Sequence, residues 1–300
     1  MKQLLLLVLA STILQISITN IANAQMIGYD RKRASDSFNI IDTSHLVVCY
    51  DYYFKDKNDK EYHDIKYLEF GNNLIKYSTH IGFRMDTLDS RMSETKTSYN
   101  PYKALGLAEN DFPDREDIYF NWPKADWLTV TNLVCDNELY YEEKFPYMEW
   151  TILVETDTIS GYFCRSAQTV FRGRTYTVFF TVDIPLGIGP WKFNGLPGLI
   201  LYAYDEDRNF CWKIKSISQF ETGPIMLAQD RKKHKCSSMS EYKRLSDKLL
   251  KDPLGAYTER YANKFIQKDE FGNVKEISRE EINSILLSVM PIFYDKEILE

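Results

Sequence analysis

The sequence contains few residues of the types that most often carry enzymatic chemistry. It has only four histidines among 300 residues, and no two have the spacing that places metal ligands on one face of a helix. The glycine patterns of a nucleophile elbow, a phosphate loop and a dinucleotide-binding turn are all absent. We therefore predict no catalytic residue, no cofactor and no metal ion, and we favour a binding protein over an enzyme.

One arrangement of histidines keeps a metal site open as an alternative. His45 and His63 are expected on neighbouring strands, with His80 nearby, and imidazole is a common metal ligand. Histidines at the ends of surface strands explain the same positions without a metal. The acidic run Asp205–Asp207 lacks the alternating ligands and central glycine of a calcium loop, so we interpret it as a solvated turn.

Positive charge is not concentrated in any large part of the chain. Lysine and arginine number 37 against 43 acidic residues, which gives a formal net charge of −6. Nucleic acids bind to concentrated basic surfaces, and we interpret the one basic run, residues 231–235, as a solvated connection before a helix. We therefore expect no nucleic-acid partner.

Long apolar runs are absent after the first residues. The first 24 residues contain Lys2, an apolar stretch from Leu4 and the small-residue pattern Ala22-Asn23-Ala24. Together these are typical of a secretory signal peptide, here residues 1–24, with cleavage between Ala24 and Gln25. We predict an exported protein of the periplasm, the cell envelope or the medium, with no membrane span after signal removal.

Cysteine pairs of the redox type are also missing, because no Cys-x-x-Cys spacing occurs. Export permits disulfides, but the count of five is odd, so at least one thiol has no partner within the chain. The connectivity stays open from sequence alone. Cysteine in a strand often behaves as a small buried hydrophobe, so we predict structural roles. The five are Cys49, Cys135, Cys164, Cys211 and Cys236.

Aromatic residues are abundant, with 21 Tyr, 17 Phe and 5 Trp. At the alternating spacing of strands they favour an antiparallel sheet. The clearest alternation spans Thr175–Ile184. Its predicted core face carries Tyr176, Val178, Phe180, Val182 and Ile184. Other predicted strands are 45–54, 65–70, 74–78, 127–134, 138–142, 150–155, 199–204 and 210–217.

Helix signals are confined to the last quarter of the chain. Ser238 with Glu241 forms a capping-box pattern for a helix that ends near Lys251, and Ser278 with Glu281 opens another. A further helix is predicted over 254–266. Strands followed by helices favour an α+β, β-dominated fold, a twisted or curved antiparallel sheet of meander or half-barrel type with C-terminal helices.

The mature chain is predicted to form one domain over residues 25–300. Its parts are a loose segment at 25–40, an antiparallel β region at 41–220 and a helical part at 236–292. Residues 84–115 carry many charged and polar side chains. We predict an irregular insertion there, with a short helix near 103–108.

The most specific segment is 189–201, with the sequence Gly-Pro-Trp-Lys-Phe-Asn-Gly-Leu-Pro-Gly-Leu-Ile-Leu. Its glycines permit backbone angles that other residues avoid, and its prolines fix theirs. Trp191 and Phe193 supply bulk between these points. We interpret this segment as one that sets the backbone conformation and packs apolar side chains at the entry to a buried strand. It contains almost no side chain that could take part in catalysis.

This segment and the residues before it resemble the GLPGLI family of exported Bacteroidetes proteins, named for the six residues found here at 195–200. Further matching elements are the Gly-Tyr-x-Cys-x-x-Ala run, the Phe-x-Gly-Arg turn and an Ile-Pro pair. The family has no established activity, so the resemblance transfers no catalytic residue. The matching positions are Gly161, Tyr162, Cys164, Ala167, Gly173, Arg174, Ile184, Pro185, Gly189, Pro190, Trp191, Lys192, Phe193, Gly195, Leu196, Pro197, Gly198, Leu199 and Ile200.

These observations favour an exported, envelope-associated or secreted protein that is not an enzyme and binds a protein partner or an apolar ligand. A curved aromatic sheet with an incompletely filled inner face would form an apolar cleft, whereas ordinary sheet packing would fill it. The alternative function is a hydrolase or another enzyme with an unrecognised active site. That alternative requires titratable groups clustered in a cleft.

Overall fold

The computed structural model describes the chain from residue 38 onward, with several gaps. The described residues are 38–84, 101–134, 137–219, 223–228, 232–252, 265–268, 274–278, 280, 281, 283, 284, 287, 296 and 297. The predicted signal peptide with its cleavage site at Ala24 and Gln25, most of the segment 25–40, and Cys135 lie outside the described residues.

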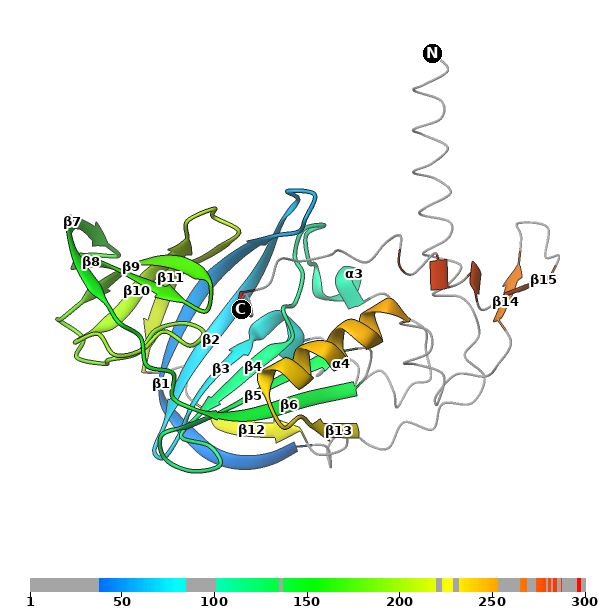
Figure 1. Ribbon diagram of the computed structural model, residues 1–300, viewed down its shortest axis with the longest axis horizontal. Coiled ribbons are helices and arrows are strands. Elements are labelled where there is room, and N and C mark those ends of the chain that lie inside the picture. Colours follow the sequence, from blue (N-terminus) through cyan, green and yellow to red (C-terminus); the bar gives the residue numbers. More distant parts are fainter. Residues whose placement is uncertain are drawn as a thin grey trace, which may run out of the picture.

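Most of the described chain forms one 13-stranded sheet (Figure 1). In hydrogen-bonded order its strands are β13 (Lys232–Lys235), β6 (Asn137–Lys144), β5 (Trp127–Val134), β4 (Glu116–Phe120), β3 (Ile75–Thr79), β2 (Glu61–Gly71), β1 (Phe38–Lys55), β11 (Phe210–Ser218), β10 (Leu199–Asp205), β9 (Arg174–Thr181), β8 (Tyr162–Phe171) and β7 (Thr151–Ile159). β12 (Pro224–Ala228) pairs with the start of β1. The pairing is antiparallel except between β13 and β6, so the predicted β-dominated, antiparallel fold class is confirmed.

The sheet is strongly curved, as contacts between side chains of strands far apart in this order show. Arg172, directly after β8, forms an ion pair with Glu143 of β6, although eight strands lie between them in the sheet. The long strand β1 has a register shift in its pairing with β11, and such bulges bend a strand and increase its twist. The face enclosed by the bend carries Tyr52 and Trp212, and we call it the inner face.

Strand β2 illustrates how side-chain alternation builds the inner face. Residues 62, 64, 66, 68 and 70 are buried, whereas the residues between them are only partly covered, because successive side chains point to opposite sides of a strand. Two of these five positions, Asp64 and Lys66, are charged, and their side chains are fully buried. The inner face therefore receives charged groups as well as apolar ones.

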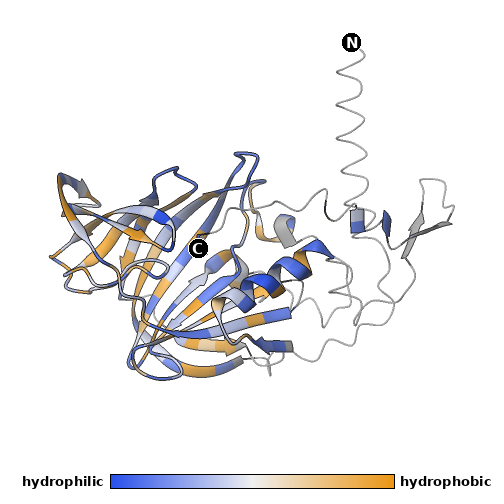
Figure 2. Ribbon diagram, in the orientation of Figure 1, coloured by the Kyte–Doolittle hydropathy of each residue, from blue (hydrophilic) through white to orange (hydrophobic). Residues whose placement is uncertain are grey.

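An aromatic layer fills much of the inner face. The indole of Trp212 stacks on Tyr52 with 4.9 Å between ring centroids and on Trp191 with 6.1 Å. Its Nε1 donates a hydrogen bond to Tyr77 Oη at 2.8 Å, and Phe193 packs edge-on against the same ring. Figure 2 shows apolar and polar residues mixed along the strands. Part of this face is thus packed core.

The alternation predicted for Thr175–Ile184 holds only as far as Thr181, where β9 ends. The first three core positions, Tyr176, Val178 and Phe180, are buried. Val182 is 54% exposed and Ile184 is only partly buried. The prediction is wrong for these two residues because the chain turns after the strand, and the two-residue period no longer applies.

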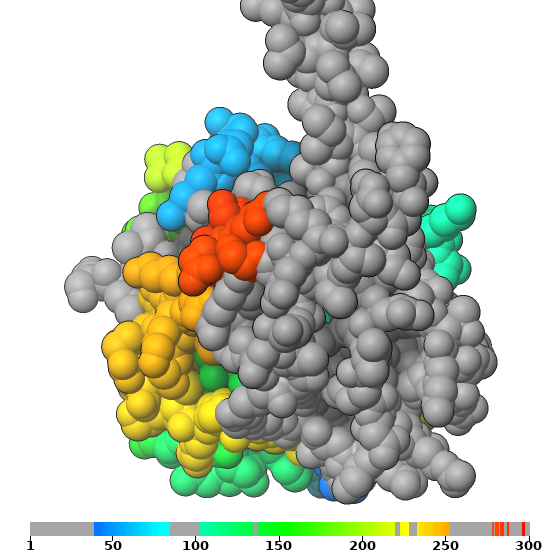
Figure 3. Space-filling view, turned by 90° about the vertical axis from the view of Figure 1, so that its right-hand side faces the viewer, coloured from blue at the N-terminus to red at the C-terminus, as the bar shows by residue number. Residues whose placement is uncertain are grey.

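Among the described residues, helices α3 (Pro101–Leu105) and α4 (Met239–Lys251) lie beside the sheet. The predicted cap of α4 is confirmed, since Ser238 Oγ accepts a hydrogen bond from Glu241 N at 3.2 Å. One side of α4 packs onto the core and contacts β5 and β6, and Figure 3 shows the helix in gold on the surface. The second capping bond, from Glu281 N to Ser278 Oγ, is also present at 3.1 Å.

Some elements differ from the predictions. Strands β4, β8, β12, β13 and β15 (Val274–Ile277) have no counterpart among the strand ranges predicted from sequence. Of the run 231–235, residues 232–235 form β13, which pairs with β6, and Lys235 Nζ lies 2.8 Å from Glu142 Oε2. Residues 233–235 are exposed as predicted, but they form a paired strand. β14 (Phe265–Lys268) pairs with β15, so the helix predicted over 254–266 is wrong at its last two positions.

The part of the chain that the structure describes contains no helix long and apolar enough to cross a bilayer.

Candidate functional site

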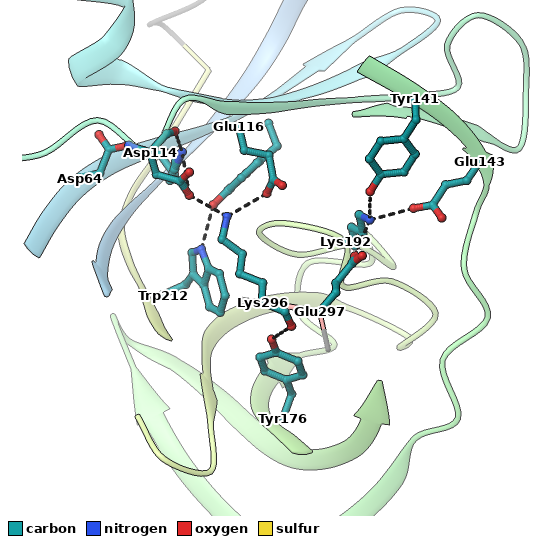
Figure 4. A network of polar contacts seen from close by, with 12 residues as sticks. Asp64, Asp114, Glu116, Tyr141, Glu143, Tyr176, Lys192, Trp212, Lys296 and Glu297 are labelled. Atoms are coloured by element: carbon teal, nitrogen blue, oxygen red, sulfur yellow. Dashed lines mark hydrogen bonds and ion pairs between the residues drawn. The ribbon is translucent and has the colours of Figure 1, made fainter. Parts of the chain in front are cut away.

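A cluster of buried and partly buried charged side chains lies on the inner face (Figure 4). Its members, which we call the inner-face charge cluster, are Asp64, Lys66, Asp114, Glu116, Glu143, Arg172, Lys192, Lys296 and Glu297. They come from β2, β4 and the residue two before it, β6, the turn after β8, the 189–201 segment and residues 296–297. Buried charges are costly unless they are paired, so this concentration identifies the candidate site.

The acidic half of the cluster holds Lys296. Its Nζ donates hydrogen bonds to Asp114 Oδ2 at 2.6 Å and to Glu116 Oε1 at 2.8 Å, and it lies 5.5 Å from the ring centroid of Tyr52. Burial disfavours the ammonium, but the two carboxylates outweigh it and raise the pKa of Lys296 well above its ordinary value. Lys296 is therefore a cation at neutral pH.

Lys66 is the second cation that pairs with carboxyl groups of the acidic half. Its Nζ lies 3.4 Å from Asp64 Oδ2 and 3.6 Å from Asp114 Oδ2, and it donates to the carbonyl of Asp114. Burial opposes ionisation of Asp114, but Lys296 and Lys66 together lower the pKa of this carboxyl. For Asp64 burial dominates over Lys66 and raises the pKa. Without Lys296, one lysine faces three carboxyl groups here, so the acidic half has a net negative formal charge that a second cation can balance.

The basic half of the cluster holds Glu297. One carboxylate oxygen accepts from Lys192 Nζ and the other accepts from Arg172 Nη1 at 2.6 Å. Glu143 joins the same two cations, with Oε1 at 2.8 Å from Lys192 Nζ and Oε2 accepting from Arg172 Nη2. Burial opposes ionisation of Glu143, but Lys192 and Arg172 lower its pKa. Tyr141 Oη accepts from Lys192 Nζ at 2.8 Å.

The backbone between the two halves is held as well. The hydroxyl of Tyr176 donates to the carbonyl of Lys296 at 2.7 Å. The dipeptide Lys296–Glu297 is therefore fixed at its ammonium, its joining carbonyl and its carboxylate, and its side chains are only 13% and 11% exposed. Figure 4 shows Lys296 directed toward Asp114 and Glu116.

Lys192 belongs to the 189–201 segment, which we interpreted from sequence as a packing device with almost no group for chemistry. Its neighbours Trp191 and Phe193 are buried in the aromatic layer. Lys192 between them is 1% exposed, and its ammonium lies in the inner-face charge cluster. The interpretation was therefore wrong for this residue. The available signal was a lysine placed between two aromatic residues in an otherwise apolar segment.

The glycines of the same segment shape the loop that presents Lys192. Gly195 has φ of +91°, a conformation that favours glycine. A Cβ added at Gly198 would lie 1.9 Å from the carbonyl oxygen of Thr181, because the loop passes directly over the end of β9. Gly189 N donates to the carbonyl of Phe193 at 2.9 Å, which closes the chain around Lys192.

The Phe-x-Gly-Arg turn supplies the second cation of the basic half. Arg172 and Gly173 have φ of +46° and +80°, as a tight hairpin between two strands requires. Arg172 enters the cluster, whereas Arg174 Nη1 lies 3.0 Å from Asp205 Oδ2. Asp205 is 1% exposed and also accepts from Phe210 N at 2.8 Å. The solvated turn predicted for Asp205 is therefore wrong.

The other GLPGLI-like positions lie in strands or at their connections. Buried among them are Cys164, Ala167, Leu196, Leu199 and Ile200. Gly161 adopts φ of +86° at the turn before β8. Ile184 accepts a hydrogen bond at its carbonyl from Leu199 N at 2.9 Å, which ties the end of β9 to the start of β10.

The histidines considered for a metal site do not come together. His63 lies between two carboxylates, with Nε2 3.1 Å from Asp51 Oδ1 and Nδ1 2.9 Å from Asp111 Oδ1. His80 stacks on a tyrosine ring, and His45 is exposed. Among the described residues there is no group of three or more side chains that could hold a metal ion.

The described cysteines are covered and not activated. Cys49, Cys164 and Cys236 are buried, and Cys211 is partly buried. Burial raises the pKa of the Cys164, Cys211 and Cys236 thiols, whereas a reactive cysteine needs a lowered pKa. Their environment is that of packed side chains, not of nucleophiles.

A cavity of about 180 Å³ lies on the opposite face of the sheet. Its lining mixes charged side chains, among them Glu69, Lys76 and Asp117, with apolar ones such as Phe83 and Met226. Apolar ligands are usually held in larger cavities, so this small cavity with a mixed lining gives the apolar-ligand hypothesis little support.

Comparison with known proteins gives no family assignment. No family model matches the sequence, and no curated protein matches it. Two solved structures of PNGF-II are distantly similar, the P21 crystal form with a TM-score of 0.41 at 17% identity and the C2 form with 0.42 at 15%. Each match covers 69% of this chain and 33% of the PNGF-II chain, so this chain spans about a third of that protein's length. Similarity at this level carries no functional argument.

Proposed function

We propose that this chain is an exported, non-enzymatic protein that binds a protein partner in the inner-face charge cluster. Export is inferred from the signal-like start, and the GLPGLI resemblance is consistent with it. The observation that carries the binding proposal is the dipeptide Lys296–Glu297, which the cluster holds by both side chains and one carbonyl. The same charges and hydrogen-bonding groups suit a similar segment of another protein.

Charge favours a protein segment over an apolar ligand. An apolar occupant would leave Asp114 and Glu116 with too little positive charge and Lys192 and Arg172 with too little negative charge. Uncompensated buried charge is strongly unfavourable. A peptide with one cationic and one acidic side chain satisfies both halves, so we prefer a protein partner to the apolar ligand that the sequence left open.

A hydrolase is the second candidate, for one specific reason. Asp114 and Glu116 both contact the ammonium of Lys296, so two carboxylates approach one point, as acid–base catalysis on a substrate requires. Against this, Lys296 and Lys66 outweigh burial and lower the pKa of Asp114, which makes it a poor proton donor at neutral pH. Binding accounts for more of the contacts.

Site-specific photocrosslinking tests the binding proposal. A photoreactive phenylalanine analogue replaces Met239, whose sulfur lies 2.8 Å from Arg172 Nη1 at the edge of the cluster. In a matched control it replaces Phe163, which is 59% exposed on β8. After irradiation of intact cells we expect a crosslinked polypeptide from the Met239 position and none from Phe163. Equal yields at the two positions, or no crosslink at Met239, would contradict the proposal.

A further inference from the structure

The inner-face charge cluster has two halves of opposite formal charge when residues 296–297 are set aside. Among the described residues, the acidic half then holds the carboxyl groups of Asp64, Asp114 and Glu116 with the ammonium of Lys66, and the basic half holds Arg172 and Lys192 with the carboxyl group of Glu143. One half therefore requires a cation from its occupant, and the other requires an anion. The site is complementary to a pair of charges, not to a single one.

The two halves are reached by adjacent residues in a fixed order. Lys296 and Glu297 are neighbours at a bend of the chain, and their side chains enter different halves of the cluster. The hydroxyl of Tyr176 donates to the carbonyl that joins them, which sets the direction of the chain. In that direction, a segment with glutamate before lysine would place its carboxylate against Asp114 and Glu116.

Resting on the proposed function, we infer that the cluster selects a protein segment in which a lysine is followed directly by an acidic residue. Lys296–Glu297 is then an internal competitor that occupies the place of the partner segment. Because it belongs to the same chain, it has a high effective concentration and weakens the apparent affinity for the partner. An empty site would leave buried charges uncompensated. The partner segment therefore binds as Lys296–Glu297 leaves the site.

Titration with a labelled peptide tests this inference. The probe is a fluorescent peptide with the sequence of residues 294–300, Tyr-Asp-Lys-Glu-Ile-Leu-Glu. The control peptide exchanges its lysine and the following glutamate, which keeps composition and net charge. The full chain is compared by fluorescence anisotropy with Glu297→Gln and with Lys296→Ala/Glu297→Ala. A matched control, Lys248→Ala/Glu206→Ala, removes the same side-chain types from exposed positions.

We expect the probe to bind the Lys296→Ala/Glu297→Ala variant roughly tenfold or more tightly than the unchanged chain, with Glu297→Gln in between. The exchanged peptide should bind each variant roughly tenfold more weakly than the probe, and the matched control should behave like the unchanged chain. Circular dichroism checks folding, and if the double variant does not fold, Glu297→Gln decides.

No gain in the folded variants, or equal affinity for the two peptides, would overturn the inference. A crosslink confined to Met239 together with equal affinity for both peptides would remove this inference and leave the proposed function standing. The absence of that crosslink would instead count against the proposed function itself.

Discussion

Lys192 is the residue that most changes the interpretation of the sequence. Its neighbours Trp191 and Phe193 could be assigned to a core from their residue type and the surrounding glycines. The role of Lys192 depends instead on Glu143 and Glu297, which lie 49 and 105 positions away. No local pattern marks these partners, so the packing of the segment was predictable and its part in the charged site was not.

Replacing Lys192 tests whether its ion pairs matter. We predict that Lys192→Met lowers the free energy of unfolding by about 3–5 kcal/mol, because the partly buried carboxylates of Glu143 and Glu297 then keep Arg172 as their one ion-pair partner among the described residues. The matched control is Lys215→Met, whose lysine is 47% exposed in its own ion pair and should contribute less than about 1 kcal/mol. Urea unfolding measures both variants, and equal losses would contradict the prediction.

Gly198 provides a second test at the level of one residue. A Cβ at this position would lie 1.9 Å from the Thr181 carbonyl oxygen, so we predict that Gly198→Ala prevents accumulation of folded, soluble protein. At Gly161, φ is +86° but no atom lies within 4 Å of an added Cβ. Gly161→Ala should therefore cost only about 1–2 kcal/mol. Soluble yield and thermal unfolding distinguish them, and similar behaviour of the two variants would refute the prediction.

At the scale of secondary-structure elements, strands with a sequence pattern of their own were predictable and short, paired strands were not. β5, β10 and β11 lie within a residue of the ranges 127–134, 199–204 and 210–217. Side chains alternate along β11, β10 is apolar from Leu199 to Tyr204, and β5 is rich in strand-forming residues. β13 contains no apolar residue. It forms a strand through parallel pairing with β6, and such distant pairing leaves no periodic signal in the short strand itself.

The cap of α4 yields a prediction at this scale. Ser238 accepts the backbone hydrogen bond of Glu241, so Ser238→Ala should lower the free energy of unfolding by about 1 kcal/mol. Ser246 lies inside the same helix, where alanine is the better helix former, so Ser246→Ala should cause no loss. Urea midpoints compare the two, and equal midpoints would show that the cap does not stabilise α4.

At the scale of the whole molecule, the candidate site exists only because the sheet curves and brings distant segments together. The ion pair between Lys296 and Asp114 joins residues 182 positions apart. Alternating aromatic and polar residues were enough to predict a curved antiparallel sheet, because that pattern acts along each strand. They could not predict which charged residues would meet on its inner face, because those contacts depend on strand order and curvature.

Acidic pH should lower the stability of the folded protein, because it protonates carboxylates of the inner-face charge cluster. Burial opposes ionisation of Glu143 and Asp114, but their cationic partners lower both pKa values from the ordinary 4.5 and 3.8. The stability they contribute is present above those values and is lost as the pH falls through the lowered pKa values. Asp64, with its pKa raised by burial, acts in the opposite sense. We expect thermal stability to fall below about pH 4.5.

The variant Glu143→Gln identifies the source of this pH dependence. It removes one carboxyl with a lowered pKa, so the fall in melting temperature on acidification should be shallower than in the unchanged chain. Identical slopes for the two proteins would show that acid acts elsewhere.

The binding role of the inner-face charge cluster is tested most directly by the ratio of two affinities in Glu297→Gln. These are the affinities for the peptide of residues 294–300 and for the same peptide with its lysine and the following glutamate exchanged. We expect a preference of roughly tenfold for the native order, because only that order places each charge opposite its complement. A ratio near one would contradict the claim that the site selects a lysine followed by an acidic residue.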